Sequence, residues 1–170
     1  VCQSLSHAPA HQPCGARYPA HLARIAARHA DDPDVLAMQS FAHELCGDFA
    51  SASALAEKSL RIEARNPWAE HTLSHVAIRL GDVDAGERRL RAFLPVAATC
   101  SRPVHSHTAW HVAMFDLERL DHARALALLR SREIAHPHLV PTMFVRLLRL
   151  PDAERADFFA PALRLVLHGA

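Results

Sequence analysis

The chain has 170 residues, half of them hydrophobic, and its 19 basic and 18 acidic residues leave a formal net charge of +1. This near-neutral balance argues against a polyanionic partner, so we expect no nucleic acid. Arg, His or Asp interrupts every apolar segment well before the roughly 20 residues that a membrane span needs. We therefore expect no membrane partner and a soluble, cytoplasmic protein.

The first residues differ in composition from the rest of the chain. Residues 1–18 contain Pro9, Pro13 and Gly15 without hydrophobic periodicity, which is typical of a leader or linker. We expect a flexible leader over residues 1–18 and one helical domain over residues 19–170. Apolar residues at helical spacing predict a first helix over residues 19–30, which Asp31-Asp32-Pro33 ends.

A 34-residue spacing runs through the middle of the chain. Pro33 and Gly47-Asp48 recur as Pro67 and Gly81-Asp82. This is the period of the tetratricopeptide repeat, in which two helices are joined by a short turn. The pattern predicts helices over residues 34–46 and 49–63, then over 68–80 and 84–96. Each Gly suits a left-handed position at the end of a helix.

A third, degenerate pair follows. Helical spacing predicts helices over residues 105–119 and 122–132, with Leu120-Asp121 at the turn and a longer connection over residues 97–103. Two closing helices are expected over residues 139–150 and 156–167, and no segment has a convincing strand pattern. Terminal repeats are commonly atypical. The sequence thus predicts an all-α fold, a right-handed α-solenoid of tetratricopeptide-like helix pairs with atypical closing helices.

The repeat register predicts which side chains face the concave groove of such a solenoid. The first helix of each pair lines the groove. Counting from Gly81 places Trp68, His71 and His75 on this face, and counting from Leu120 places His107, Trp110 and His111 there. The tryptophans suit stacking on a ligand or packing between helices. These six residues are the predicted ligand-binding groove.

The four groove histidines form two pairs with i, i+4 spacing, so each pair lies on one helical face. Neutral imidazole ligates Zn, Fe, Cu and Ni, so a transition metal is the candidate cofactor. Glu44 or Asp116 is a candidate carboxylate ligand. Histidines in helical repeats also serve as packing residues hydrogen-bonded to their neighbours. Both interpretations stay open, and no nucleophile–base pattern identifies a catalytic residue.

Two segments resemble a known family. They are Asn66-Pro67-Trp68-Ala69-Glu70-His71 with His75-Val76, and His107-Thr108-Ala109-Trp110-His111 continuing to Glu118. Together they are similar to the paired motifs of the tetratricopeptide repeat protein 38 family, over roughly residues 31–129. Ala109 stands where that pattern has Trp, and Asp116 where it has His. The resemblance implies a degenerate helical-repeat fold and no particular reaction.

The pattern as a whole favours a binding or scaffold protein whose His/Trp-lined groove holds a peptide, a partner protein or a small ligand. The alternative is a metal-binding protein or metalloenzyme that uses His71, His75, His107 and His111 with Glu44 or Asp116. A third option is an accessory protein that assists a neighbouring enzyme.

Overall fold

The computed structural model describes residues 22, 24–131, 134–135, 137–139, 141–156 and 159–168. The predicted leader over residues 1–18 lies outside them. The chain divides between Phe93 and Leu94 into two compact units, which are described separately below. The described residues are predominantly helical, which confirms the all-α class. The right-handed solenoid and the single domain over residues 19–170 stay predictions.

The first unit contains the helices of the 34-residue repeat. They are α2 (Pro33–Leu45), α3 (Phe49–Ile62), α4 (Pro67–Leu80) and the start of α5 (Val83–Ala97), and each begins and ends within two residues of its predicted bounds. Asp32 caps α2 and Asn66 caps α4, in each case by accepting hydrogen bonds from two backbone amides. Proline follows each cap at the first helical position, where no backbone donor is needed.

Before α2 the chain is helical at residues 22 and 24–26 and then turns at residues 27–28. The predicted helix to Ala30 therefore ends early. The backbone amides of Arg28 and His29 bond to carbonyls three residues back, which tightens the chain out of the α-helix.

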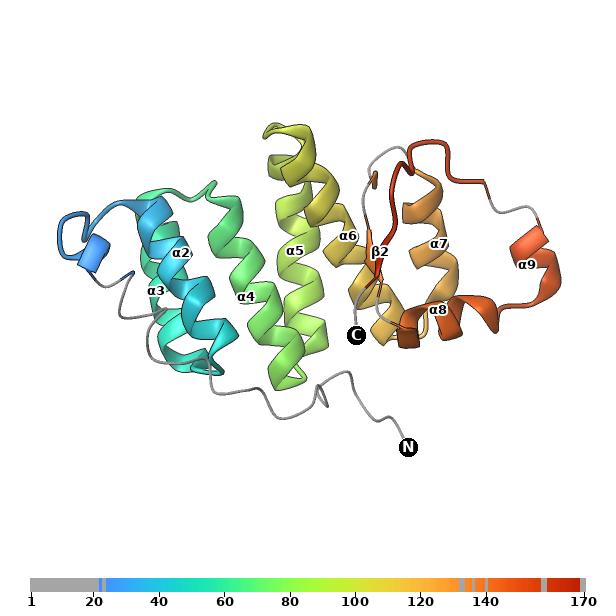
Figure 1. Ribbon diagram of the computed structural model, residues 1–170, viewed down its shortest axis with the longest axis horizontal. Coiled ribbons are helices and arrows are strands. Elements are labelled where there is room, and N and C mark those ends of the chain that lie inside the picture. The colour runs from blue at the N-terminus through green and yellow to red at the C-terminus, as the bar shows by residue number, and fades with distance from the viewer. Residues whose placement is uncertain are drawn as a thin grey trace. The chain divides into compact units, whose positions relative to one another are not determined.

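Small residues bring the helices of the first unit together. Helices α2, α3 and α4 pack pairwise and lie side by side in Figure 1. Their contact is built on Ala37, Ala56 and Ala69, each fully buried, with Leu60 and Leu73 packed around them. Alanine at a helix crossing lets two backbones approach closely, so polar groups also reach across. The hydroxyl of Ser40 on α2, for example, donates to the carbonyl of Ala52 on α3 over 2.8 Å.

Three helix-to-helix turns have the same structure. The residues Gly47, Gly81 and Leu120 have φ angles of 79°, 79° and 61°. In each turn the next residue is an aspartate whose amide donates to a carbonyl five residues back over 2.9 Å. The carboxylates of Asp48, Asp82 and Asp121 then cap the following helix at the third residue on. The predicted positions of all three turns are confirmed.

The second unit contains α6 (Arg102–Glu118) and α7 (His122–Arg130), which pack against each other. Helix α6 begins before its predicted start at His105, because Pro103 sits in the first turn of a helix at no cost in hydrogen bonds. Two shorter helices come later in the chain, α8 (Pro141–Leu148) and α9 (Asp152–Ala156).

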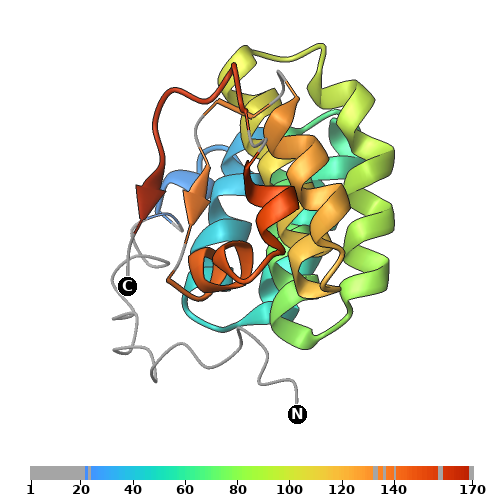
Figure 2. The same cartoon turned by 90° about the vertical axis from the view of Figure 1, so that its right-hand side faces the viewer.

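The predicted closing helix over residues 156–167 is wrong. The chain leaves α9 at Ala156, and Leu167–His168 form β2, which pairs in parallel with β1 (His138–Leu139), as the two arrows in Figure 2 show. Pro161 explains the error, since a proline inside a helix removes a hydrogen bond and clashes with the preceding turn. This two-residue bridge is the one strand pairing that the described residues show.

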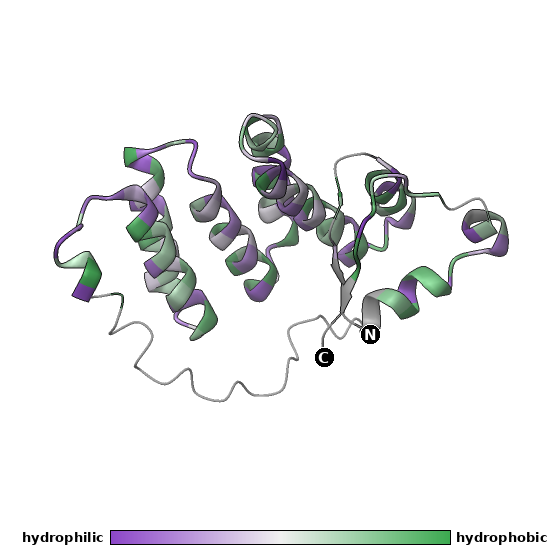
Figure 3. Ribbon diagram, turned by 45° about the horizontal axis from the view of Figure 1, so that its top comes forward, coloured by the Kyte–Doolittle hydropathy of each residue, from purple (hydrophilic) through white to green (hydrophobic). Residues whose placement is uncertain are grey.

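Figure 3 shows polar and apolar residues interleaved along α2 to α5. Among the helices that the structure describes, none combines the length and the hydropathy that a membrane crossing requires.

Candidate metal centre

Helix α4 presents His71 and His75 one turn apart on the same face. Their ring centroids lie 4.3 Å apart, and each ring offers a nitrogen within 4.8 Å of the other. Both side chains are half-buried. The cap at Asn66 and the proline after it set the phase of α4 from its first residue, so the sequence places these rings by fixing where the helix begins.

The carboxylate of Glu44 lies next to this pair. Glu44 is in the last turn of α2 and is only 4% exposed. Its Oε2 has no hydrogen-bond partner among the described residues and lies 3.6 Å from Nδ1 of His75. Two further effects disfavour a negative charge here. Burial removes the hydration of the Glu44 carboxylate, and the negative C-terminal end of the α2 dipole lies close to it. A cation beside this carboxylate would offset both effects.

Aromatic rings flank the histidine pair. Phe41, one turn before Glu44 on α2, lies 5.6 Å from the ring centroid of His71 and 6.0 Å from that of His75. Trp68, one turn before His71 on α4, meets that ring edge-on at 5.8 Å and is 44% exposed. Sequence reasoning missed Phe41, although its i, i+3 spacing from Glu44 places both on one face of α2.

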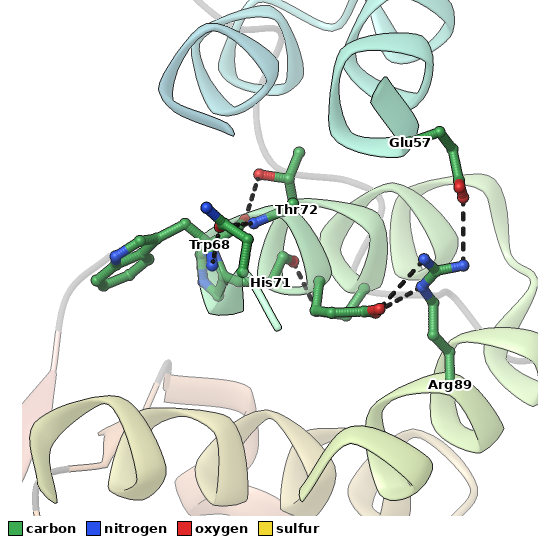
Figure 4. Close-up of polar contacts among 9 residues, drawn as sticks. Glu57, Trp68, His71, Thr72 and Arg89 are labelled. Carbon is green, nitrogen blue, oxygen red and sulfur yellow. Dashed lines mark hydrogen bonds and ion pairs between the residues drawn. The ribbon is translucent and has the colours of Figure 1, made fainter. Parts of the chain in front are cut away.

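Arg89 links α4 to its neighbouring helices through two ion pairs, which Figure 4 draws as dashed lines. Arg89 on α5 bonds to Glu70 on α4 over 2.6 Å and lies 3.2 Å from a carboxylate oxygen of Glu57 on α3. Burial raises the pKa of Glu70, and the adjacent Arg89 guanidinium partly offsets this effect. The hydroxyl of Thr72 donates to the carbonyl of Trp68 over 3.0 Å and adds to the rigidity of the first turn.

The other predicted pair belongs to the second unit. On α6, Nε2 of His107 lies 3.1 Å from Nε2 of His111, and the rings meet edge-on. Between them in sequence, Trp110 is 1% exposed. Asp116 is fully buried, with its Oδ1 4.0 Å from the guanidinium of Arg124.

The two candidate carboxylates thus differ, because Asp116 has a cation beside it and Glu44 has only His75. Within the first unit the structure brings together His71, His75 and Glu44. The expectation that all four histidines share one ion concerns both units and stays a prediction.

Comparisons with protein-family models, with curated proteins and with solved structures find no match to this chain. The resemblance to the tetratricopeptide repeat protein 38 family stays a prediction.

Proposed function

We propose that this protein binds a transition-metal ion through the imidazoles of His71 and His75 and the carboxylate of Glu44. The observation that carries the proposal is the buried Oε2 of Glu44, which faces His75 at 3.6 Å and accepts no hydrogen bond from the described residues. A buried carboxylate oxygen normally accepts a close hydrogen bond, and the 3.6 Å between Oε2 of Glu44 and His75 is too long for one. A cation between the carboxylate and the two rings would balance the charge of Glu44 and give its Oε2 a ligand bond.

Two imidazoles and one carboxylate form a ligand set found in metalloproteins. The set suits zinc, and with open positions it suits iron as well. Protein ligands would fill three positions and leave the rest to water or a bound molecule. The exposed Trp68 beside His71 would then border the open side. Such a centre is compatible with a binding role and with metal-assisted hydrolysis.

Elemental analysis of untagged protein tests the proposal. Protein purified from metal-supplemented growth should retain about one equivalent of a transition metal and release it to a chelator. The variants Glu44→Gln and His75→Ala should retain much less. His29→Gln is the matched control, because His29 is an exposed histidine of the same unit. Equal metal content in the wild type, Glu44→Gln and His29→Gln would refute the site.

A second candidate function is recognition of a peptide or partner protein by the surface around Trp68. The observation in its favour is the 44% exposure of this ring in the first turn of α4. Exposed tryptophan is a common anchor of binding interfaces. A displayed peptide library should give sequences that bind the wild type and lose binding to Trp68→Ala. Leu80→Ala, which removes another exposed apolar side chain of α4, should bind them normally. Equal binding to both variants would place the interface elsewhere.

A further inference from the structure

The second unit contains a hollow whose described lining includes no histidine. Its described lining is two arginines, Arg102 and Arg164, with Pro161 and Ala162 between them. Arg102 is the first residue of α6, and Arg164 lies in the irregular segment that precedes β2. Residues far apart in sequence therefore bring two cationic side chains to one place.

Buried hydrogen bonds fix the frame of this hollow. One turn after Arg102, the hydroxyl of Ser106 accepts the backbone N–H of Ala135 over 2.9 Å. The carbonyl of Ala135 in turn accepts the backbone N–H of Arg164 over 2.9 Å. Ser106, Ala135 and Ala162 are all at least nine-tenths buried. The backbone of Arg164, an exposed residue, is thus tied to α6 through these two hydrogen bonds, of which the one between Ser106 and Ala135 is buried.

The described lining of the hollow carries two positive charges. Among the described residues, neither guanidinium has a hydrogen bond or an ion pair, and no acidic residue is part of the described lining. The other arginine close in sequence behaves differently, since Arg155 pairs with Asp152 on α9. The positive end of the α6 dipole adds to the potential at Arg102. Both arginines are exposed, so an anion can reach them from solvent, and the two positive charges together attract it.

We propose that this hollow binds a phosphomonoester. Guanidinium groups donate in a planar fork that matches the oxygens of phosphate, and two arginines together balance a dianion. The apolar surface of Pro161 and Ala162 offers contact to the organic group that carries the phosphate. The proposal is independent of the metal centre, which lies in the other unit and uses other residues.

Amide NMR titrations of the full chain test the site with phenyl phosphate, inorganic phosphate and phenol as probes. Phenyl phosphate should shift the amides of residues 102–106 and 162–165 and bind more tightly than inorganic phosphate, and phenol should shift neither group. Arg102→Gln and Arg164→Gln should each weaken phenyl phosphate binding about tenfold, as the loss of a charge-assisted bond of about 1.4 kcal/mol predicts. Arg149→Gln, which removes an exposed arginine of the same unit, should leave binding unchanged.

A further variant distinguishes a preorganised binding site from two surface charges that act independently. Ser106→Ala keeps both arginines and removes the acceptor of the Ala135 amide. It should weaken binding of phenyl phosphate while the helicity of the chain stays unchanged. Equal binding of phenyl phosphate by the wild type, Arg102→Gln and Arg164→Gln would overturn the proposal. An equal loss of binding in these two variants and in the control Arg149→Gln would overturn it as well.

Discussion

Gly81 and Leu120 take the same left-handed backbone conformation at the ends of α4 and α6, with φ angles of 79° and 61°. Glycine adopts this conformation at no steric cost, whereas leucine is strained in it. The chain keeps the same turn at both places because the aspartate that follows makes the same two hydrogen bonds. The third turn is therefore a degenerate copy that retains the geometry without the residue best suited to it.

Opposite substitutions at these two positions should have opposite effects on stability. A Cβ added at Gly81 meets nothing within 4 Å, so Gly81→Ala should cost only the backbone strain, about 1 kcal/mol. Leu120 is 56% exposed, so Leu120→Gly loses little packing and should stabilise the chain by about 0.5 kcal/mol. Urea denaturation measures both free energies of unfolding. The same sign for the two variants would contradict the shared turn.

The cap of α4 should matter more than the cap of α2. Asn66 caps two amides of α4 and also donates from its side chain to Asp34 on α2 over 2.8 Å, and it is 2% exposed. Asp32 caps two amides of α2 in the same way but is more exposed. We expect Asn66→Ala to cost about 2 kcal/mol and Asp32→Ala about 1 kcal/mol. A cost for Asp32→Ala equal to or above that for Asn66→Ala in urea denaturation would mean that the link to Asp34 contributes nothing.

Burial of Glu70 should leave a signature in the pH dependence of stability. Its pKa is raised from 4.5 because burial disfavours the charged form. The folded chain then holds this proton more tightly than the unfolded chain. The contribution of the group is fully present below its unfolded pKa and is lost as the pH rises through its folded pKa.

The free energy of unfolding of the wild type, minus that of Glu70→Gln, should therefore fall as the pH rises from below 4.5 through the raised pKa of the folded chain. Urea denaturation at several pH values in this range measures the difference. A difference that rises with pH would show that the ion pair with Arg89 outweighs the burial of Glu70.

The sequence encodes the turns and helix starts of this protein locally, and these could be predicted. Gly-Asp at the turns and Asp-Pro or Asn-Pro at the helix starts determine backbone conformation with little help from tertiary contacts. The closing segment over residues 156–167 is harder to predict. Its apolar residues have helical spacing, but Pro161 prevents a continuous helix there.

The candidate site could be predicted only in part. The i, i+4 spacing of His71 and His75 fixes their common face, and the register also pointed to Glu44. Burial and the missing hydrogen bond of Glu44 depend on how α2 packs on α4, which the sequence does not show. The same dependence explains why Phe41 was missed beside the histidines, and why the exposure of Trp68 and the burial of Trp110 could not be told apart.

Protons should compete with the metal for His71 and His75. Imidazole binds a metal only in its neutral form, so metal affinity should fall steeply below about pH 6. Competition with a metal-binding dye at several pH values measures this fall. In His71→Ala the remaining affinity should be far lower at neutral pH, and an affinity independent of pH would argue against imidazole ligands.

The central claim is tested most directly by thermal and urea denaturation of the wild type and Glu44→Gln, each with and without Zn²⁺. Zn²⁺ at a free concentration a hundred times its dissociation constant should stabilise the wild type by about 2.7 kcal/mol and leave the stability of Glu44→Gln almost unchanged. Without metal, Glu44→Gln should be at least as stable as the wild type, because it removes a buried charge that lacks a hydrogen bond. Equal stabilisation of both proteins by Zn²⁺, or a large loss of stability in metal-free Glu44→Gln, would contradict the proposal that Glu44, His71 and His75 form a metal centre.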